Sequence, residues 1–325
     1  MKIKKIAATS KGKVELLEVE IPDAKLAADE IEGGAVSSVI SPGTETAVAL
    51  GLCGGFPLGL GYAMVFRVEK CGSEVKDFKP GNLAFCMRNH ESFHRAKAAD
   101  CVRVPEGLDA TVAPFARLMG ISMSTLATTT ARPPNIIIIT GLGIVGNLAA
   151  QIFQRCGYDV YAVEPNEARR KMAEDCGVKK ILPAMPLTDP KINEKVRLVV
   201  DCSGHEAAVL DALKIVGQRG EVVLLGVPWS RKTEIYAYEA FHAVFHKYAV
   251  LRSGWEWEVP VQPVSFKESS MLANFKGALS WLKEGSVSVN GIYDVAKPAE
   301  AGKIYETYIK GKPKYLTTVF DWKDV

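Results

Sequence analysis

Hydrophobic and polar residues alternate in two different ways along the chain. Up to about residue 110, short apolar runs such as residues 14–17, 62–68 and 101–104 are broken by Gly, Pro and Asp. Frequent short strands separated by turns favour an antiparallel barrel or sandwich. From about residue 110 the runs are longer, and the Ala-, Leu- and Met-rich stretch 110–128 predicts a helix that is stopped by the loop 129–134, which contains Pro133 and Pro134.

The middle of the chain alternates continuous apolar runs with helical patterns. Residues 135–140 read Asn-Ile-Ile-Ile-Ile-Thr, which is typical of a strand buried on both faces of a parallel sheet. Alternating strands and helices of these lengths predict a doubly wound sheet. The predicted elements that follow are helix 144–155, strand 159–163, helix 167–176, strand 198–202, helix 206–216 and strand 221–226, and near the end helices 269–283 and 299–310 and strand 315–320.

A glycine motif follows the predicted strand 135–140. Residues 141–146 read Gly-Leu-Gly-Ile-Val-Gly, and they open the predicted helix, which is the context that gives such a motif its meaning. Gly141 permits a tight turn, Gly143 lets the backbone approach a diphosphate, and Gly146 lets the helix pack on the strand. The motif therefore predicts a dinucleotide site.

The second strand of the predicted sheet ends at Glu164, where dinucleotide-binding proteins carry an acid that accepts hydrogen bonds from the ribose hydroxyls. Its negative charge repels a 2′-phosphate, so NAD is favoured over NADP. Arg169 and Arg170 could instead contact that phosphate, so NADP remains an alternative. The predicted cofactor-binding residues are Gly141, Gly143, Ile144, Val145, Gly146, Glu164, Arg169, Ser203 and Val227.

Composition narrows the classes of function. The chain has 325 residues, which suggests two domains, with 48% hydrophobic and 24% charged residues and a formal net charge of +3. No run of Lys and Arg predicts nucleic-acid binding, and no apolar stretch predicts a membrane span or a secretory signal. The seven cysteines form no CxxC pair. They are typical of reduced thiols in a cytoplasmic protein.

These motifs resemble the medium-chain dehydrogenase/reductase family, the relatives of zinc alcohol dehydrogenase and quinone reductase. The resemblance implies an α/β fold in which a Rossmann domain, with a doubly wound parallel sheet, is inserted into a GroES-like β-barrel catalytic domain. It also implies a homodimer through the Rossmann edge strand near residues 249–252. The expected domains are 1–123 and 265–325 for the catalytic part and 124–264 for the Rossmann part. The resemblance is carried by residues 29–31, 41–45, 61–63, 141–146, 201–204 and 220–226.

The chain departs from the zinc-containing members where they hold the metal. Ser41 and Pro42 stand where those members have Cys, Tyr62 and Ala63 replace a His-Glu pair, and residues 114–117 offer no ligand. A lobe with four cysteines is missing as well. Because Zn²⁺ needs three or four ligands, the sequence predicts no metal site. The departures are similar to a zinc-lacking branch that includes proteins like bacteriochlorophyllide hydroxyethyl dehydrogenase and polyol or sugar dehydrogenases. His90 and His94, four apart on a predicted loop, make a poor metal pair.

Without zinc, hydrogen-bond donors must manage the charge on the substrate oxygen. Tyr62 is the first candidate, since it takes the place of the lost histidine, and it could instead be a packing residue. Thr44 stands where the family has a relay hydroxyl, and it could instead bond within its own turn. The other candidates are Glu45 (or a helix-start acid), Ser41, His90 (or a surface histidine), Arg117 as an anchor for an anionic substrate, and Trp255 as a pocket wall (or hinge packing).

The sequence thus predicts a zinc-independent, NAD-preferring oxidoreductase that acts on a small molecule, a secondary alcohol or its ketone, with a polyol or sugar as the expected class. Two alternatives stay open. One is an NADPH-dependent reductase of enones or quinones, and the other is a dinucleotide-binding scaffold or redox sensor without turnover.

Overall fold

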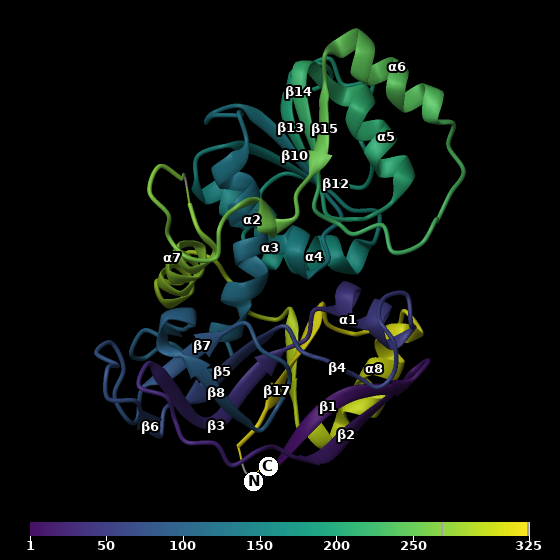
Figure 1. Ribbon diagram of the computed structural model, residues 1–325. Helices are drawn as coiled ribbons and strands as arrows, with labels where there is room; N and C mark the ends of the chain where they lie inside the picture. Colours follow the sequence, from purple (N-terminus) through teal and green to yellow (C-terminus); the bar gives the residue numbers. More distant parts are fainter. Residues whose placement is uncertain (268, 324) are drawn as a thin grey trace. The chain divides into compact units, whose positions relative to one another are not determined.

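A computed structural model describes residues 1–267, 269–323 and 325, and it divides into two compact units (Figure 1). Unit 1 contains residues 1–117, 275–285 and 291–325, so both ends of the chain contribute to it. Unit 2 contains residues 118–274 and 286–290. Residues 118–123 and 265–274 lie in unit 2, whereas the sequence boundaries place them with the chain ends.

Unit 2 is built on a six-stranded parallel sheet with the order β12-β11-β10-β13-β14-β15. The order reverses between β10 and β13, as in a doubly wound sheet, and ligands of such sheets bind outside the carboxyl ends of the strands at this point. The strands are β10 (Ile136–Thr140), β11 (Asp159–Val163), β12 (Ile181–Leu182), β13 (Val196–Asp201), β14 (Val216–Leu224) and β15 (Val250–Ser253).

Helices cover both faces of this sheet, which explains the continuous apolar runs. Ile137 and Ile139 pack in one core with Phe153 of the helix that follows β10, while Ile138 packs in a second core with Leu213. All three isoleucines are fully buried, so the prediction of a strand covered on both faces is confirmed. The helices are α2 (Ala116–Thr128), α3 (Ile144–Arg155), α4 (Glu167–Asp175), α5 (Glu206–Ile215) and α6 (Ala237–Lys247).

Two elements of unit 2 differ from the sequence prediction. The helix expected from residue 110 begins at Ala116, because Pro114 lies in a 3-10 turn, Ala113–Phe115, that precedes it. Helix α6 was not predicted at all. It carries most of its aromatic side chains on the exposed side, so no buried apolar stripe signals it.

Unit 1 consists of mostly antiparallel strands, with one parallel pair near the C-terminus, and of helices from both ends of the chain. One sheet has the order β2-β1-β4 and a larger one the order β16-β17-β3-β5-β7-β9, with β6 and β8 also paired to β3. The strands are β1 (Lys2–Ser10), β2 (Lys13–Glu20), β3 (Glu30–Val39), β4 (Leu58–Gly59), β5 (Ala63–Arg67), β6 (Lys70–Cys71), β7 (Leu83–Cys86), β8 (Phe93–Lys97), β9 (Val102–Arg103), β16 (Tyr293–Ala296) and β17 (Thr317–Asp321).

The C-terminal segment completes the core of unit 1. Strand β17 pairs antiparallel with β3, and helix α8 (Ala301–Ile309) supplies Tyr305, which is fully buried beside Phe320. The remaining helices are α1 (Pro42–Ala49) and α7 (Met271–Lys283). The architecture is that of a Rossmann domain with a GroES-like domain made from both chain ends, as the resemblance implies. Among the described residues, no helix is long and apolar enough to cross a membrane.

Candidate functional site

The glycine motif of unit 2 forms a tight turn between β10 and α3. Gly141 has φ +79°, a conformation that L side chains rarely adopt, and a Cβ there would lie 2.9 Å from the backbone of Ser203. A Cβ on Gly146 would lie 1.8 Å from the carbonyl oxygen of Gly141, so α3 approaches the turn as closely as backbone permits. Both glycines are therefore required by packing.

Gly143 differs from its two neighbours. It has φ −63° and ψ −176°, which any residue can adopt, and a Cβ there would meet nothing within 4 Å. It is the N-cap of α3, where no side-chain cap is present. The first N–H groups of a helix have no acceptor within the helix, and the positive end of the helix dipole favours an anion. Ile144 is buried and Val145 half-buried on the first turn of the same helix.

Gly146→Ala tests the close approach. In an exposed helix this change stabilises by about 1 kcal/mol, because Ala is the better helix former. Here the Cβ must push against a backbone carbonyl, and overpacking of this kind costs about 1–3 kcal/mol. We therefore expect a net loss of stability in denaturant unfolding. Gly143→Ala is the control, since its methyl group enters open space; equal stability of the Gly146 variant and the wild type would contradict this packing.

Glu164 is placed at the glycine turn. Its side chain is 3% exposed, with Oε2 accepting from the backbone N–H of Leu142 at 2.7 Å and Oε1 from that of Asn166 at 2.9 Å. A carboxylate has about four acceptor sites, so it can accept further hydrogen bonds from a ribose. Arg169 lies beside it, with Nη1 3.8 Å from Oε2. The side chain of Arg170 instead donates to the carbonyls of residues 164 and 165.

Asp201 has a role that the sequence analysis missed. It is fully buried at the end of β13 and accepts hydrogen bonds from the Thr140 hydroxyl at 2.6 Å and from Ser203 and Gly204. It thereby ties the end of β10 to the turn after β13. Ser203 uses its hydroxyl for this contact, and Val227, 48% exposed, follows the end of β14. The sequence did carry a signal for this contact, because Thr140 and Asp201 are polar residues at the carboxyl ends of two predicted strands.

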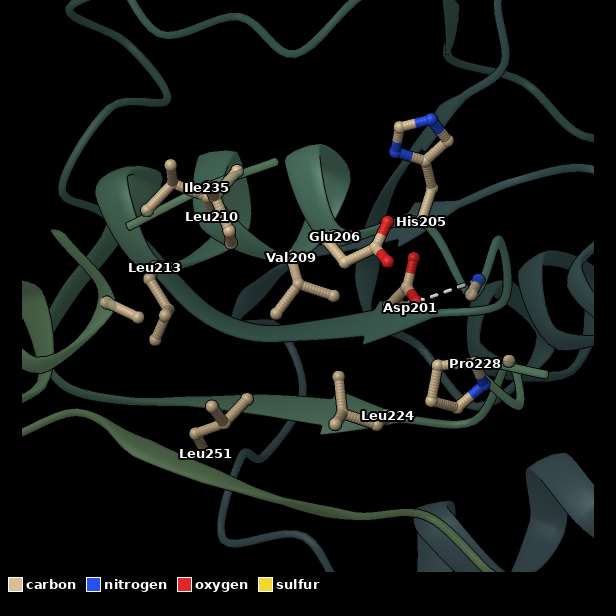
Figure 2. A pocket seen from close by; sticks show the side chains of 13 residues that line it. Asp201, His205, Glu206, Val209, Leu210, Leu213, Leu224, Pro228, Ile235 and Leu251 are labelled. Carbon is tan, nitrogen blue, oxygen red and sulfur yellow. Dashed lines mark hydrogen bonds between the residues drawn. The ribbon is translucent and has the colours of Figure 1, made fainter. Parts of the chain in front are cut away.

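An apolar pocket of about 230 Å³ lies beside this turn, within unit 2 (Figure 2). Leucines from α5, β14 and β15 line its interior, and Asp201 and His205 lie at one end. Sequence reasoning gave no signal for it, because its walls come from five elements that are separated along the chain. The lining includes Gly204, Leu210, Leu213, Leu224, Gly226 and Leu251.

In unit 1 the structure brings two predicted residues together. Tyr62 is half-buried directly before β5, and the guanidinium carbon of Arg117 lies 4.0 Å from the centre of its ring. The ring centre of Phe275 lies 5.6 Å from the same guanidinium carbon. Arg117 is only 3% exposed, so its charge is held against the phenol ring.

A second group of predicted residues is also brought together, but inside the unit. Nε2 of His90 lies 3.0 Å from Oε2 of Glu45, and the two residues are 0% and 3% exposed. The alternative of a surface histidine is therefore wrong. Glu45 lies in the first turn of α1, as a helix-start acid would, yet its carboxylate is turned inward. Ser41 caps α1 and is buried, and Thr44 is half-buried on its first turn.

His94 lies in strand β8, whereas the sequence analysis placed it on a loop. Burial lowers its pKa to about 3, so the ring is neutral at physiological pH. In the described part of the chain, no three His, Cys, Asp or Glu side chains are grouped so that they could hold a metal ion. In unit 2, Trp255 follows β15 and is 67% exposed.

Comparison with known proteins bears on the fold and on part of the sequence. Residues 145–256 match the family model described as zinc-binding dehydrogenase. A curated relative, 2-dehydro-3-deoxy-L-galactonate 5-dehydrogenase of Pseudoalteromonas atlantica, is 25% identical over 142 residues, 42% of each chain. The chain spans less than half the length of the first curated relatives that it matches.

Solved structures match over nearly the whole chain. Galactitol-1-phosphate dehydrogenase from Escherichia coli has a TM-score of 0.81 at 15% identity and covers 98% of this chain and 99% of its own. Acetophenone reductase from Geotrichum candidum, solved in complex with NAD, has a TM-score of 0.81 at 18% identity. The match covers 100% of this chain and 98% of the reductase chain. At such identities the likeness establishes the fold. Together with the match over residues 145–256, it supports the medium-chain dehydrogenase/reductase family, whose Rossmann and GroES-like fold this chain has.

Proposed function

We propose that the chain is a zinc-independent, NAD-preferring oxidoreductase that transfers a hydride between the nicotinamide and a secondary alcohol or its ketone. The observation that carries this proposal is the open N-terminus of α3 at Gly143, in a turn where Gly141 and Gly146 are enforced by packing. Packing does not explain why the middle residue of this turn is a glycine. A bound dinucleotide would explain it, because its diphosphate would lie against the backbone there.

Different residues of unit 2 would bind different parts of the cofactor. The first turn of α3 would hold the diphosphate, and Glu164 would accept hydrogen bonds from the adenosine ribose. Arg169, next to that carboxylate, is the residue that would tolerate a 2′-phosphate, so NADP is the second choice. Ser203 and Val227, at the ends of β13 and β14, are the proposed contacts on the far side of the switch point. When bound, the nicotinamide supplies the hydride chemistry.

In unit 1, Tyr62 is the proposed donor to the substrate oxygen. A phenol donates a stronger hydrogen bond to a developing alkoxide when a fixed positive charge lies beside it. Arg117 provides such a charge, with its guanidinium carbon 4.0 Å from the centre of the ring. Because Arg117 is buried against the ring, we assign it this electrostatic role in place of direct capture of an anion. Thr44 and Ser41 are secondary candidates for the proton, and Trp255 for the substrate pocket.

The substrate class rests on proteins similar to this chain. A curated relative is named for a deoxygenated sugar acid, and a matching structure is a dehydrogenase of a polyol phosphate. We therefore propose a polyol or sugar. A panel of polyols and sugars with NAD⁺, followed at steady state after dialysis against a chelator, is the direct test. Turnover that survives chelation is expected, and turnover that requires added zinc would contradict the metal-free mechanism.

The same panel separates the alternatives. Consumption of an enone or quinone with NADPH, without any reaction of an alcohol with NAD⁺, would favour a reductase of activated double bonds. NADH binding without turnover of any compound would favour a binding scaffold or sensor.

We also propose that unit 2 mediates homodimerisation. Strand β15 is at the edge of the sheet, where a row of backbone groups is left for another strand. Helix α6, directly before it, exposes an aromatic stripe with Tyr238, Phe241 and Phe245 at 72%, 69% and 77%. A free edge strand and an exposed apolar stripe each suit a two-fold contact between copies.

Replacing both Phe241 and Phe245 with Glu tests this surface. We expect the dimer to dissociate at micromolar concentration, because two carboxylates would be buried without partners. Sedimentation velocity measures the outcome. Lys171→Glu on α4 changes the net charge equally at an exposed site and should leave the dimer intact. A wild-type protein that sediments as a monomer would contradict the proposal.

A further inference from the structure

A buried hydrogen-bonded cluster in unit 1 joins segments that are far apart in the sequence. It consists of Ser38 in β3, Glu45 in α1, His90 between β7 and β8, Tyr305 in α8 and Trp322 after β17, and we call it the Glu45 cluster. Each member is at most 3% exposed. Buried polar side chains of this kind persist only where their hydrogen bonds are satisfied.

The hydrogen bonds of the cluster form a chain that ends at Glu45. Trp322 donates its indole N–H to Ser38 at 2.8 Å, and Nδ1 of His90 lies 2.7 Å from the Ser38 hydroxyl. Because a carboxylate only accepts, we assign a proton to Nε2 of His90, which donates to Glu45, and the neutral ring then accepts the Ser38 proton on Nδ1. Every side-chain donor in this arrangement has an acceptor.

Two more donors converge on the same carboxylate. The hydroxyl of Tyr305 donates to Oε2, and the backbone N–H of Ser41 donates to Oε1 at 2.6 Å. Burial, and then the charge of Glu45, raise the pKa of Tyr305 well above its usual range, so the phenol keeps its proton and remains a donor. The carboxylate is thus held by three hydrogen bonds.

Burial argues against a direct part for this pair in proton transfer. A general base must reach the reacting proton directly or through one water, and Glu45 and His90 are only 3% and 0% exposed. Their function must therefore act through the residues that they hold.

The cluster holds the two segments that carry the proposed proton-handling residues. Glu45 directly follows Thr44, and it fixes the start of α1 through Ser41. On the other side, the backbone N–H of His90 donates to the carbonyl of Leu60 at 2.8 Å, and a Cβ on Gly61 would lie 2.1 Å from that nitrogen. The segment of His90 therefore backs directly onto the residues before Tyr62.

We propose that Glu45 and His90 are positioning residues, whose buried hydrogen bond holds α1 with Thr44 and the segment with Tyr62 in a fixed mutual arrangement. The inference rests on the proposed function for the roles of Thr44 and Tyr62. In a site that works without a metal ion, this side-chain pair would fix the two segments that carry Thr44 and Tyr62.

The test compares Glu45→Met and His90→Phe, which remove the acceptor and the donor of the bond, with Tyr305→Phe. The first two break the bond between Glu45 and His90, whereas Tyr305→Phe removes a buried hydrogen bond to the same carboxylate and leaves that bond intact. In protein labelled with 3-fluorotyrosine, the ¹⁹F resonance of Tyr62, identified by its loss in Tyr62→Phe, reports the position of the ring. We expect it to shift in the first two variants and to stay in place in Tyr305→Phe.

Kinetics provide the second measurement. A misplacement of about 1 Å costs about 10²-fold in rate, so kcat should fall by about that factor in the first two variants while the Kd for NADH is unchanged. If the folded variants keep the wild-type ¹⁹F shift, the proposal is wrong. A wild-type protein without turnover would overturn the proposed function, and the ¹⁹F comparison would still decide the positioning.

The wild-type protein provides a measurement that does not depend on the variants folding. In ¹⁵N spectra of histidine-labelled protein, the ring of His90, identified by the loss of its signals in the His90 variant, should show a protonated Nε2 and an unprotonated Nδ1, with slow exchange of the Nε2 proton. A proton on Nδ1 of His90 with a bare Nε2 would mean that Glu45 does not accept from it, and would overturn the proposal.

Discussion

Gly143→Asp is expected to weaken dinucleotide binding by about 10³-fold and to leave unit 2 folded. Residue 143 has an extended backbone conformation, and its Cβ would meet no atom within 4 Å, so an aspartate is accommodated without strain. Asp is moreover a preferred N-cap residue, and it should keep or raise the stability of α3. Its carboxylate, however, occupies the place of the diphosphate at the helix N-terminus.

The expected size of the effect follows from electrostatics. Two unit charges 4 Å apart repel by about 4 kcal/mol at an effective dielectric constant of 20, which corresponds to about a 10³-fold loss of affinity. Calorimetric titration with NADH measures the loss, and thermal unfolding verifies the fold. Gly143→Ala, which adds a methyl group and no charge, should bind NADH far better than the aspartate variant. Unchanged affinity in Gly143→Asp would show that the diphosphate lies elsewhere.

Tyr62→Phe lowers turnover and leaves NADH affinity nearly intact. The phenyl ring still packs against the Arg117 guanidinium, so the variant removes the hydroxyl alone. Loss of a donor positioned for proton transfer costs about 10²–10⁴-fold in rate. The cofactor contacts proposed in unit 2 are untouched. Steady-state kinetics with the substrate found in the panel, together with NADH titration, separate the two effects.

Tyr158→Phe is a matched control for Tyr62→Phe. It removes the hydroxyl of another tyrosine, which donates to the carbonyl of Ala131 within unit 2, and it should lower stability without a comparable loss of turnover. If Tyr62→Phe turns over as fast as the wild type, Tyr62 is a packing residue and the donor must be sought at Thr44 or Ser41.

The elements that the sequence predicted well are those whose signal is local. The run at residues 136–140 and the glycines at 141, 143 and 146 lie within one short segment, and the structure gives a steric reason for the glycines at 141 and 146. Glu164 lies at the end of β11, as expected. Its place could be predicted because strand length and motif spacing are also local features of the sequence.

What the sequence could not predict depends on contacts between distant residues. Glu45 and Tyr305 are 260 positions apart, and their contact exists only because α8 packs in unit 1 near the N-terminal segment. Nothing near His90 in the sequence signals that it is buried. Helix α6 was missed for a different reason: its exposed aromatic residues run against the rule that apolar residues face the core.

Binding of NADH to the wild-type chain is the most direct test, because the proposed oxidoreductase function depends on the turn at residues 141–146. Isothermal titration calorimetry should show saturable uptake of one dinucleotide per chain. A folded protein that takes up neither NADH nor NADPH at millimolar concentration would contradict the account.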